Sequence, residues 1–549
     1  MKRAARPRTA LVLTLAVLGA TALSACTAPA TPSNGSPNAA VDPATRPELR
    51  PFYAQKLKWT ACGEFRCARL TVPMDYDDPA NGRTFVLPVA KATTADPKRR
   101  IGSLVFNPGG PGGSGVDHLK DGGADSFGAP VRERFDIVSF DPRGVGASTP
   151  ALTCEGGKEA AEPSPEVPDA PSASDDARPL SPRTEADRAD VLDGARAAAA
   201  SCVERSGSLL RHVGTRDAAR DLDVLRAALG EPRLSYLGWS YGTSLGTSYA
   251  EQFPLRVRAL VLDGAIDPSL DWRARAQGQA VGFRRAVDDY ATRCVEIVGA
   301  DSCPGATPDE IRAVVDGLFT RTARSPLPVD GSASGAGSGV DERMLIDVLS
   351  MAMYTPEEQW KGLSEALAAA DGGDGTKLAA LAEGEADPEG EAEDSEGDAA
   401  PEGGPVVPAA PADNEDAALL AVNCADTPHP RAAQPYWDAL APAEKAAGRY
   451  GTTSVLDSLT CKDLPAGTQA PHRVRAEGVP PVLVVGTTGD PATPYEESES
   501  LAAQFPGGML LTYEGVGHTA YGRGGSCVGD AVDAYLVGLK PVRPGTTCR

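Results

Sequence analysis

The stretch Leu234-Ser-Tyr-Leu-Gly-Trp-Ser-Tyr-Gly242 decides the fold of this chain. Leu234–Leu237 is a short apolar run typical of a buried strand, and Thr243–Gln252 follows with a helical pattern. Between them, a glycine stands on each side of Trp-Ser-Tyr, so the backbone can turn sharply and expose the hydroxyl of Ser240. Because G-x-S-x-G also occurs by chance in a chain with 59 glycines, a structural turn is the alternative. The strand–turn–helix context favours a nucleophilic serine.

A serine hydroxyl needs a base, and the base needs a group that orients it. Gly517-His518-Thr519 follows the last apolar run in a glycine-rich loop, so His518 is the predicted base. Asp490 follows the run Val482–Val485 and precedes His518, which matches the order Ser, acid, His found around such elbows. A turn aspartate beside a proline is the alternative for Asp490. The other histidines are interpreted as surface or packing residues: His118, His212, His429 and His472.

The segment Asn107-Pro-Gly-Gly-Pro-Gly-Gly-Ser-Gly115 directly follows a strand-like run. Backbone N–H groups with few side chains around them can reach a developing oxyanion. We assign this role to the N–H of Tyr241 and to that of Gly110. A phosphate-binding loop is the alternative, but such a loop continues with Lys-Ser/Thr, which this segment lacks.

The order of the apolar runs predicts an α/β protein, with a mostly parallel sheet flanked by helices. Strand-like runs alternate with helical patterns up to about residue 270, pause for about 200 residues, and resume at Pro481. The pause predicts a large, mainly helical cap inserted before the last strands, with helices at Ala274–Val298, Pro308–Arg324 and Asp341–Ala370. Low-complexity tracts at 155–190, 325–339 and 372–416 predict loops and disorder. Thr215–Leu229 is a predicted helix with Thr215 as its cap.

The N-terminus has the pattern of an export signal. Four basic residues precede the apolar run Leu11–Leu18, which is too short to span a membrane, and Leu23-Ser-Ala-Cys26 resembles a bacterial lipobox. This predicts lipidation at Cys26 and attachment to the outer face of the cell membrane; a secreted protein cut nearby is the alternative. The expected division is a signal at 1–26, a tether at 27–50, core at 51–270, cap at 271–470 and core at 471–549.

The composition excludes some functions. A formal net charge of −22 argues against a nucleic-acid partner, which needs clustered Lys and Arg. Of 11 cysteines, ten remain after Cys26, and an even set in an exported chain suggests disulfides. Neighbours in sequence are the predicted partners: Cys62–Cys67, Cys154–Cys202, Cys294–Cys303, Cys424–Cys461 and Cys527–Cys548.

Five motifs of this chain together resemble those of the actinobacterial tripeptidyl aminopeptidases. They are the glycine loop, Asp141-Pro-Arg-Gly-Val-Gly-Ala-Ser148, the elbow around Ser240, Gly-Asp490-Pro-Ala-Thr-Pro and Gly-His518. These aminopeptidases are exported α/β-hydrolases related to proline iminopeptidases, and the resemblance runs from about residue 50 to the C-terminus, without the acidic tract. Asn107 departs from it, because proline iminopeptidases usually open this loop with His.

The resemblance implies an exopeptidase that releases short peptides from free N-termini without a cofactor. It also points to Asn423-Cys-Ala-Asp426 as a motif of the cap, with Asp426 as the anchor for the substrate ammonium. An exposed acidic residue is the alternative for Asp426. For the protein as a whole, the alternatives are an esterase or lipase of the same fold and a non-catalytic surface lipoprotein.

Overall fold

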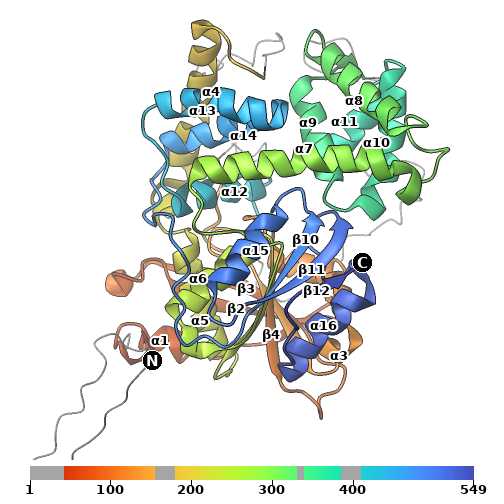
Figure 1. The fold of residues 1–549 in the computed structure, drawn as a ribbon. Helices are drawn as coiled ribbons and strands as arrows, with labels where there is room; N and C mark the ends of the chain where they lie inside the picture. The colour runs from red at the N-terminus through yellow and green to blue at the C-terminus, as the bar shows by residue number, and fades with distance from the viewer. Residues whose placement is uncertain (1–42, 155–179, 330–338, 385–409) are drawn as a thin grey trace, which may run out of the picture.

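The computed structural model describes residues 43–154, 180–329, 339–384 and 410–549. The predicted signal with Cys26, most of the tether, and the greater part of the three low-complexity tracts lie outside these residues. Figure 1 shows a sheet of strands below a broad layer of helices.

The sheet has ten strands in the order β1-β2-β3-β5-β4-β6-β7-β10-β11-β12. From β5 to β12 all neighbours are parallel, whereas β1, β2, β3 and β5 pair antiparallel. The predicted mostly parallel sheet is therefore confirmed, with an antiparallel edge at its N-terminal side. The strands are β1 Thr60–Cys62, β2 Phe65–Pro73, β3 Thr84–Ala92, β4 Gly102–Asn107, β5 Phe135–Phe140, β6 Leu234–Trp239, β7 Val257–Asp263, β10 Leu483–Gly489, β11 Met509–Val516 and β12 Thr546–Cys548.

Helices cover both faces of the sheet, because its central strands are apolar on both sides. Every residue of β4 and β5 is buried. Side chains alternate between the faces along a strand, so Leu262 packs into the core on one side and Val261 into the core on the other. The helices of this part are α1 Arg50–Tyr53, α2 Gly115–Lys120, α3 Ala129–Arg132, α5 Thr215–Ala228, α6 Tyr241–Gln252, α15 Tyr495–Gln504 and α16 Gly525–Gly538.

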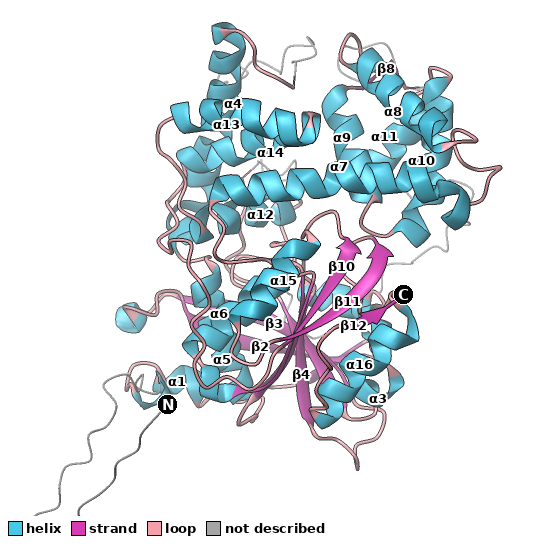
Figure 2. Ribbon diagram, viewed as in Figure 1, coloured by secondary structure: helices cyan, strands magenta, loops and turns pink. Residues whose placement is uncertain are grey.

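The helical layer lies over the carboxyl ends of the strands, and we call helices α7–α14 the cap. Figure 2 shows the arrowheads of β10 and β11 pointing toward α7, which crosses above them. The helices of the cap are α7 Trp272–Ile297, α8 Pro308–Thr322, α9 Glu342–Ala352, α10 Pro356–Asp371, α11 Thr376–Ala382, α12 Asn414–Asp426, α13 Gln434–Ala447 and α14 Arg449–Asp457. A short antiparallel pair of strands, β8 Leu327–Pro328 and β9 Gly339–Val340, lies between α8 and α9 in the sequence. Helix α4, Glu185–Ser206, packs beside α13 through Val191, Leu192 and Ala195.

Several predicted elements differ from the structure. The helix expected over Asp341–Ala370 is two helices, because Pro356 cannot continue α9 and instead begins α10. Thr215 does not cap α5 with its side chain: the N-cap is Gly214, and Thr215 is the first helical residue. Parts of the tract expected to be disordered are helical, since α11 and the start of α12 fall within 372–416.

All five predicted disulfides are present in the structure. Cys424–Cys461 joins α12 to the end of the cap, and Cys527–Cys548 joins α16 to β12. Among the residues that the structure describes, no helix is long and apolar enough to cross a membrane.

Candidate active site

Ser240 stands at the turn between β6 and α6, in a backbone conformation that few residues adopt. Its φ is 54° and its ψ is −123°, and its N–H donates to the carbonyl of Asp263 at 3.0 Å. The flanking glycines make this turn possible: a Cβ on Gly242 would lie 2.6 Å from the carbonyl oxygen of Asn107. The sharp turn predicted from the sequence is thus present, with Ser240 at the carboxyl end of β6. Its positive φ is a strained conformation for a residue other than glycine.

His518 and Asp490 are in direct contact. Nδ1 of His518 lies 2.9 Å and 3.0 Å from the two carboxylate oxygens of Asp490. Asp490 is fully buried and also accepts from the N–H groups of Ala492, Thr493 and Thr519. These bonds fix the carboxylate, which in turn orients the imidazole so that Nε2 is free to accept a proton.

Nε2 of His518 is buried and makes no hydrogen bond to any part of the described chain. The contact between Ser240 and His518 is therefore open in this structure, as is common before substrate binds. The imidazole is held from the other side by Tyr354 of the cap. The backbone N–H of His518 donates to the Tyr354 carbonyl at 2.8 Å, and the two rings meet edge to face at 5.1 Å.

The glycine loop lies against the elbow at the position expected of an oxyanion hole. Gly109 is packed so closely that a Cβ there would lie 2.7 Å from the carbonyl of Trp239, and its φ is +108°. Gly110 lines the same cavity as Ser240. Tyr241 is the first residue of α6, so its N–H has no acceptor within the helix. Neither predicted N–H group donates to an acceptor in the described part of the chain, and their role as an oxyanion hole stays a prediction.

A cavity of about 470 Å³ contains Ser240 and is roofed by the cap. Trp272, Arg275 and Phe283 of α7 line it from above, and Thr493 and Glu497 line it from the core. This volume is in the range of pockets that hold small ligands.

Helix α7 also forms hydrogen bonds to the loop that contains Asp490. Gln279 donates to the carbonyl of Ala492 at 3.2 Å, and Arg285 donates to that of Asp490 at 3.4 Å. The His518 loop is bound to the cap in a similar way. Arg523 donates to the carbonyls of Thr519, at 2.8 Å, and Val516, and lies 3.3 Å from Glu357 of α10. The cap therefore contacts the loops of both the acid and the base.

Asp263, at the end of β7, is a residue of the site that sequence reasoning missed. It is fully buried, and its carboxylate accepts from the N–H groups of Ala520, at 3.0 and 3.1 Å, and Tyr521, at 2.7 Å. Its pKa is raised to about 6, chiefly by burial and also by the charge of Asp490, while the backbone hydrogen bonds and His518 act to lower it. Its carbonyl holds the Ser240 N–H, so Asp263 links the elbow to the His518 loop. An aspartate at a strand end is the only signal that the sequence offers.

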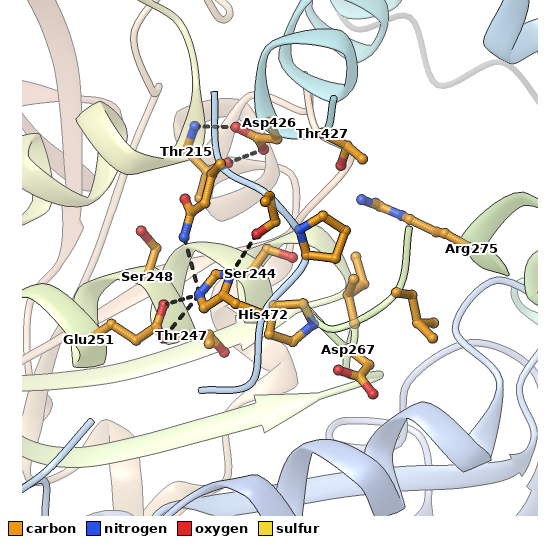
Figure 3. A pocket seen from close by; sticks show the side chains of 16 residues that line it. Thr215, Ser244, Thr247, Ser248, Glu251, Asp267, Arg275, Asp426, Thr427 and His472 are labelled. Atoms are coloured by element: carbon orange, nitrogen blue, oxygen red, sulfur yellow. Dashed lines mark hydrogen bonds and ion pairs between the residues drawn. The ribbon is translucent and has the colours of Figure 1, made fainter. Parts of the chain in front are cut away.

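Asp426 does not line this cavity but a neighbouring pocket, which shares Ile266, Arg275 and Thr427 with it. Figure 3 shows this pocket, in which the two oxygens of Asp426 accept from the Thr215 N–H at 2.7 Å and the Thr215 hydroxyl at 2.6 Å. The carboxylate thus satisfies a free N–H at the start of α5, the capping role that was predicted for Thr215. The Thr215 hydroxyl also meets the Tyr241 hydroxyl at 2.5 Å. The role of Asp426 as amine anchor stays a prediction.

Comparison with known proteins places the chain in a family. Residues 102–302 match the model of the alpha/beta hydrolase fold, and residues 445–548 match that of the TAP-like proteins. Serine protease Hip1 of Mycobacterium tuberculosis is 35% identical over 91% of this chain and 92% of its own length. Tripeptidyl aminopeptidase of Streptomyces lividans is 33% identical over 89% and 84%. Carboxylesterase B of Mycobacterium tuberculosis is 32% identical over 91% of each chain. The chain therefore belongs to the tripeptidyl aminopeptidase family of α/β-hydrolases and is an enzyme of the serine hydrolase class.

Proposed function

We propose that this protein is a serine exopeptidase that releases short peptides, tripeptides in the first place, from the free N-termini of peptide substrates. The observation that carries the proposal is the contact of His518 Nδ1 with Asp490 at 2.9 Å, together with a cavity under the cap that Ser240 and Gly110 line. The names of the relatives, a serine protease and a tripeptidyl aminopeptidase, support a peptide substrate.

Each residue has a defined step in this reaction. The Ser240 oxygen attacks the scissile carbonyl, and His518 takes the hydroxyl proton on Nε2 while Asp490 holds Nδ1. The N–H groups of Gly110 and Tyr241 stabilise the oxyanion. When the C–N bond breaks, His518 returns the proton to the leaving amine. Water then attacks the acyl-enzyme with His518 as base, and the short peptide leaves with a new carboxylate.

Because the cap covers the cavity, the position of the substrate end matters. Helix α7 lies over Ser240, so only a few substrate residues fit on the acyl side. The cleavage site is therefore set by its distance from the substrate N-terminus. An aminopeptidase also needs an anion that holds the substrate ammonium. Export and lipidation at Cys26 complete the proposal, because the substrate would then be peptides outside the cell.

The proposal is tested with matched substrates. Rates are measured for free-amine di- and tripeptidyl anilides, their N-acetylated twins and a short-chain ester, with wild type and Ser240→Ala. We expect the free tripeptidyl anilide to be the best substrate and the variant to lose activity by several orders of magnitude. Equal rates on free and acetylated peptides would exclude an aminopeptidase.

Esterase activity is the second candidate, because the relative named carboxylesterase B matches this chain over 91% of its length. The same elbow and oxyanion hole can cleave an ester. In the assay above, an esterase would prefer the short-chain ester and ignore N-acetylation of a peptide.

A further inference from the structure

An aminopeptidase needs a negative charge inside the cavity that holds Ser240, and the described lining offers three carboxylates: Asp416, Asp457 and Glu497. Asp457 is already paired, since its carboxylate lies 2.7 Å from the guanidinium of Arg343. Asp416 is exposed at the start of α12, where water screens its charge. Glu497 is the carboxylate of the lining that is both buried and without an ion pair in the described chain.

Glu497 is on α15, seven residues after Asp490, and is 7% exposed. One carboxylate oxygen accepts from the Asp267 N–H at 3.0 Å, which fixes the side chain. The other oxygen, Oε1, makes no hydrogen bond to any residue that the structure describes. Unlike Nε2 of His518, Oε1 is reached by solvent from the cavity, so a ligand can supply a donor to it.

The helix opposite leaves room at this oxygen. Gly278 of α7 faces it: a Cβ built there would meet only Oε1 of Glu497, at 3.7 Å. Glycine inside a helix is less favourable than alanine, so its presence in α7 has a cost in stability. The absence of a side chain at this point keeps the space beside Oε1 open on the cap side.

The charges around Glu497 are mixed. Its pKa is raised to about 7, chiefly by burial and also by the charges of Asp267 and Asp490, while the bond from the Asp267 N–H and the charge of Arg275 act to lower it. Arg275 lines the same cavity but lies beyond the 4 Å of an ion pair, so it does not occupy the carboxylate. A substrate ammonium placed at Oε1 would add the direct partner that is missing and favour the ionised form.

We propose that Glu497 binds the α-ammonium group of the substrate, through Oε1, in the space beside Gly278. This rests on the proposed aminopeptidase function and replaces Asp426, whose oxygens are both bonded to Thr215. The ligand class is an unblocked peptide N-terminus, and the same carboxylate disfavours a blocked one, because a blocked substrate displaces water from Oε1 without supplying a cationic donor.

The test compares Glu497→Gln with Asp426→Asn and a matched control, Glu496→Gln. Glu496 is the neighbouring glutamate, exposed and 3.6 Å from Arg285. In Glu497→Gln the side-chain amide oxygen can still accept from the Asp267 N–H, so the fold is kept. We expect Glu497→Gln to lower kcat/KM on a free-amine tripeptidyl anilide by about 30-fold or more, as expected for loss of a buried charged partner. Its rate on the acetylated twin should stay within about threefold of wild type, and Glu496→Gln should resemble wild type on both.

Each outcome decides a separate claim. If Glu497→Gln slows both substrates equally, or slows neither, Glu497 is not the anchor. If Asp426→Asn removes the preference for the free amine and Glu497→Gln does not, the anchor is Asp426. If wild type itself shows no preference for the free amine, the proposed aminopeptidase function fails, whatever the variants do. Turnover of the acetylated anilide and the thermal midpoint show that each variant is folded.

Discussion

Replacing Asp263 by asparagine tests whether the end of β7 holds the base in place. In the wild type this buried carboxylate accepts from the N–H groups of Ala520 and Tyr521, directly after His518, while its carbonyl holds the N–H of Ser240. Asparagine keeps the size of the side chain but has one accepting oxygen and an NH₂ group. Oδ2 of Asp263 accepts from both N–H groups, and Oδ1 makes a second contact with that of Ala520. The asparagine oxygen can keep the pair at Oδ2, but its NH₂ group then faces the Ala520 N–H and cannot accept from it.

The magnitude follows from these contacts. A hydrogen bond to a charged group contributes about 1.5–3 kcal/mol, and Asp263→Asn loses about one such bond. Relief of the buried charge, whose pKa is raised to about 6 by burial, offsets part of this loss. We expect a net effect of about 1–3 kcal/mol on the conformation of the His518 loop. Since each 1.36 kcal/mol in the barrier is about tenfold in rate, kcat should fall about 10- to 100-fold.

The assay is steady-state hydrolysis of the free tripeptidyl anilide, with kcat and KM determined separately. KM should change little, because Asp263 does not line the cavity. Asp533→Asn is the matched control: its carboxylate is also buried, but it accepts from the Tyr521 hydroxyl, at 2.6 Å, and not from a backbone N–H of the His518 loop. A folded Asp263→Asn enzyme with kcat within twofold of wild type, or a loss no larger than that of Asp533→Asn, would refute the reasoning.

Three further predictions concern the same site. The kcat/KM for the free-amine substrate, divided by that for the acetylated one, should rise with pH through about 7 as Glu497 ionises. This ratio should fall above about 8, as the substrate amine loses its proton. Glu497→Gln should lack the rise. Because burial raises the pKa of Glu497 and Asp263, these carboxyls bind protons more tightly in the folded state than in the unfolded chain. Calorimetry should therefore show a higher thermal midpoint near pH 5.5 than near pH 7.5, and the difference between the two midpoints should be smaller in Glu497→Gln. Arg523→Lys cannot hold two carbonyls and Glu357 together, so initial-rate kinetics should show kcat lower by about tenfold with KM unchanged, and an unchanged kcat would show that this link is dispensable.

The elbow and the order of its partners were readable from the sequence, because they depend on local backbone geometry. Glycines at 238 and 242 are required by the turn at Ser240, and the strand–turn–helix pattern is contiguous. Asp490 and His518 each follow a strand, and parallel strands end at the same edge of the sheet, so their meeting was also predictable. Pro356 could have predicted the break between α9 and α10, because proline does not fit inside a helix. The helical periodicity on both sides of it obscured this break.

Contacts between distant segments were not readable in this way. Asp426 and Thr215 are 211 residues apart, and only the folded structure shows that the Asp426 carboxylate accepts the hydrogen bond of the Thr215 N–H. The bond from His518 to the carbonyl of Tyr354 involves backbone atoms, so no residue type marks it. Asp263 and Glu497 gain their environment from burial by segments far along the chain, and in the sequence they look like ordinary acidic residues.

The most direct test of the account is covalent labelling with a tripeptidyl phosphonate that carries a free amine, followed by peptide mapping. The account predicts one adduct, on Ser240, formed at least about 30-fold faster than with the N-acetylated phosphonate. An adduct on another serine would contradict the assignment of the nucleophile, and equal rates for the two reagents would contradict an enzyme that acts from the free N-terminus.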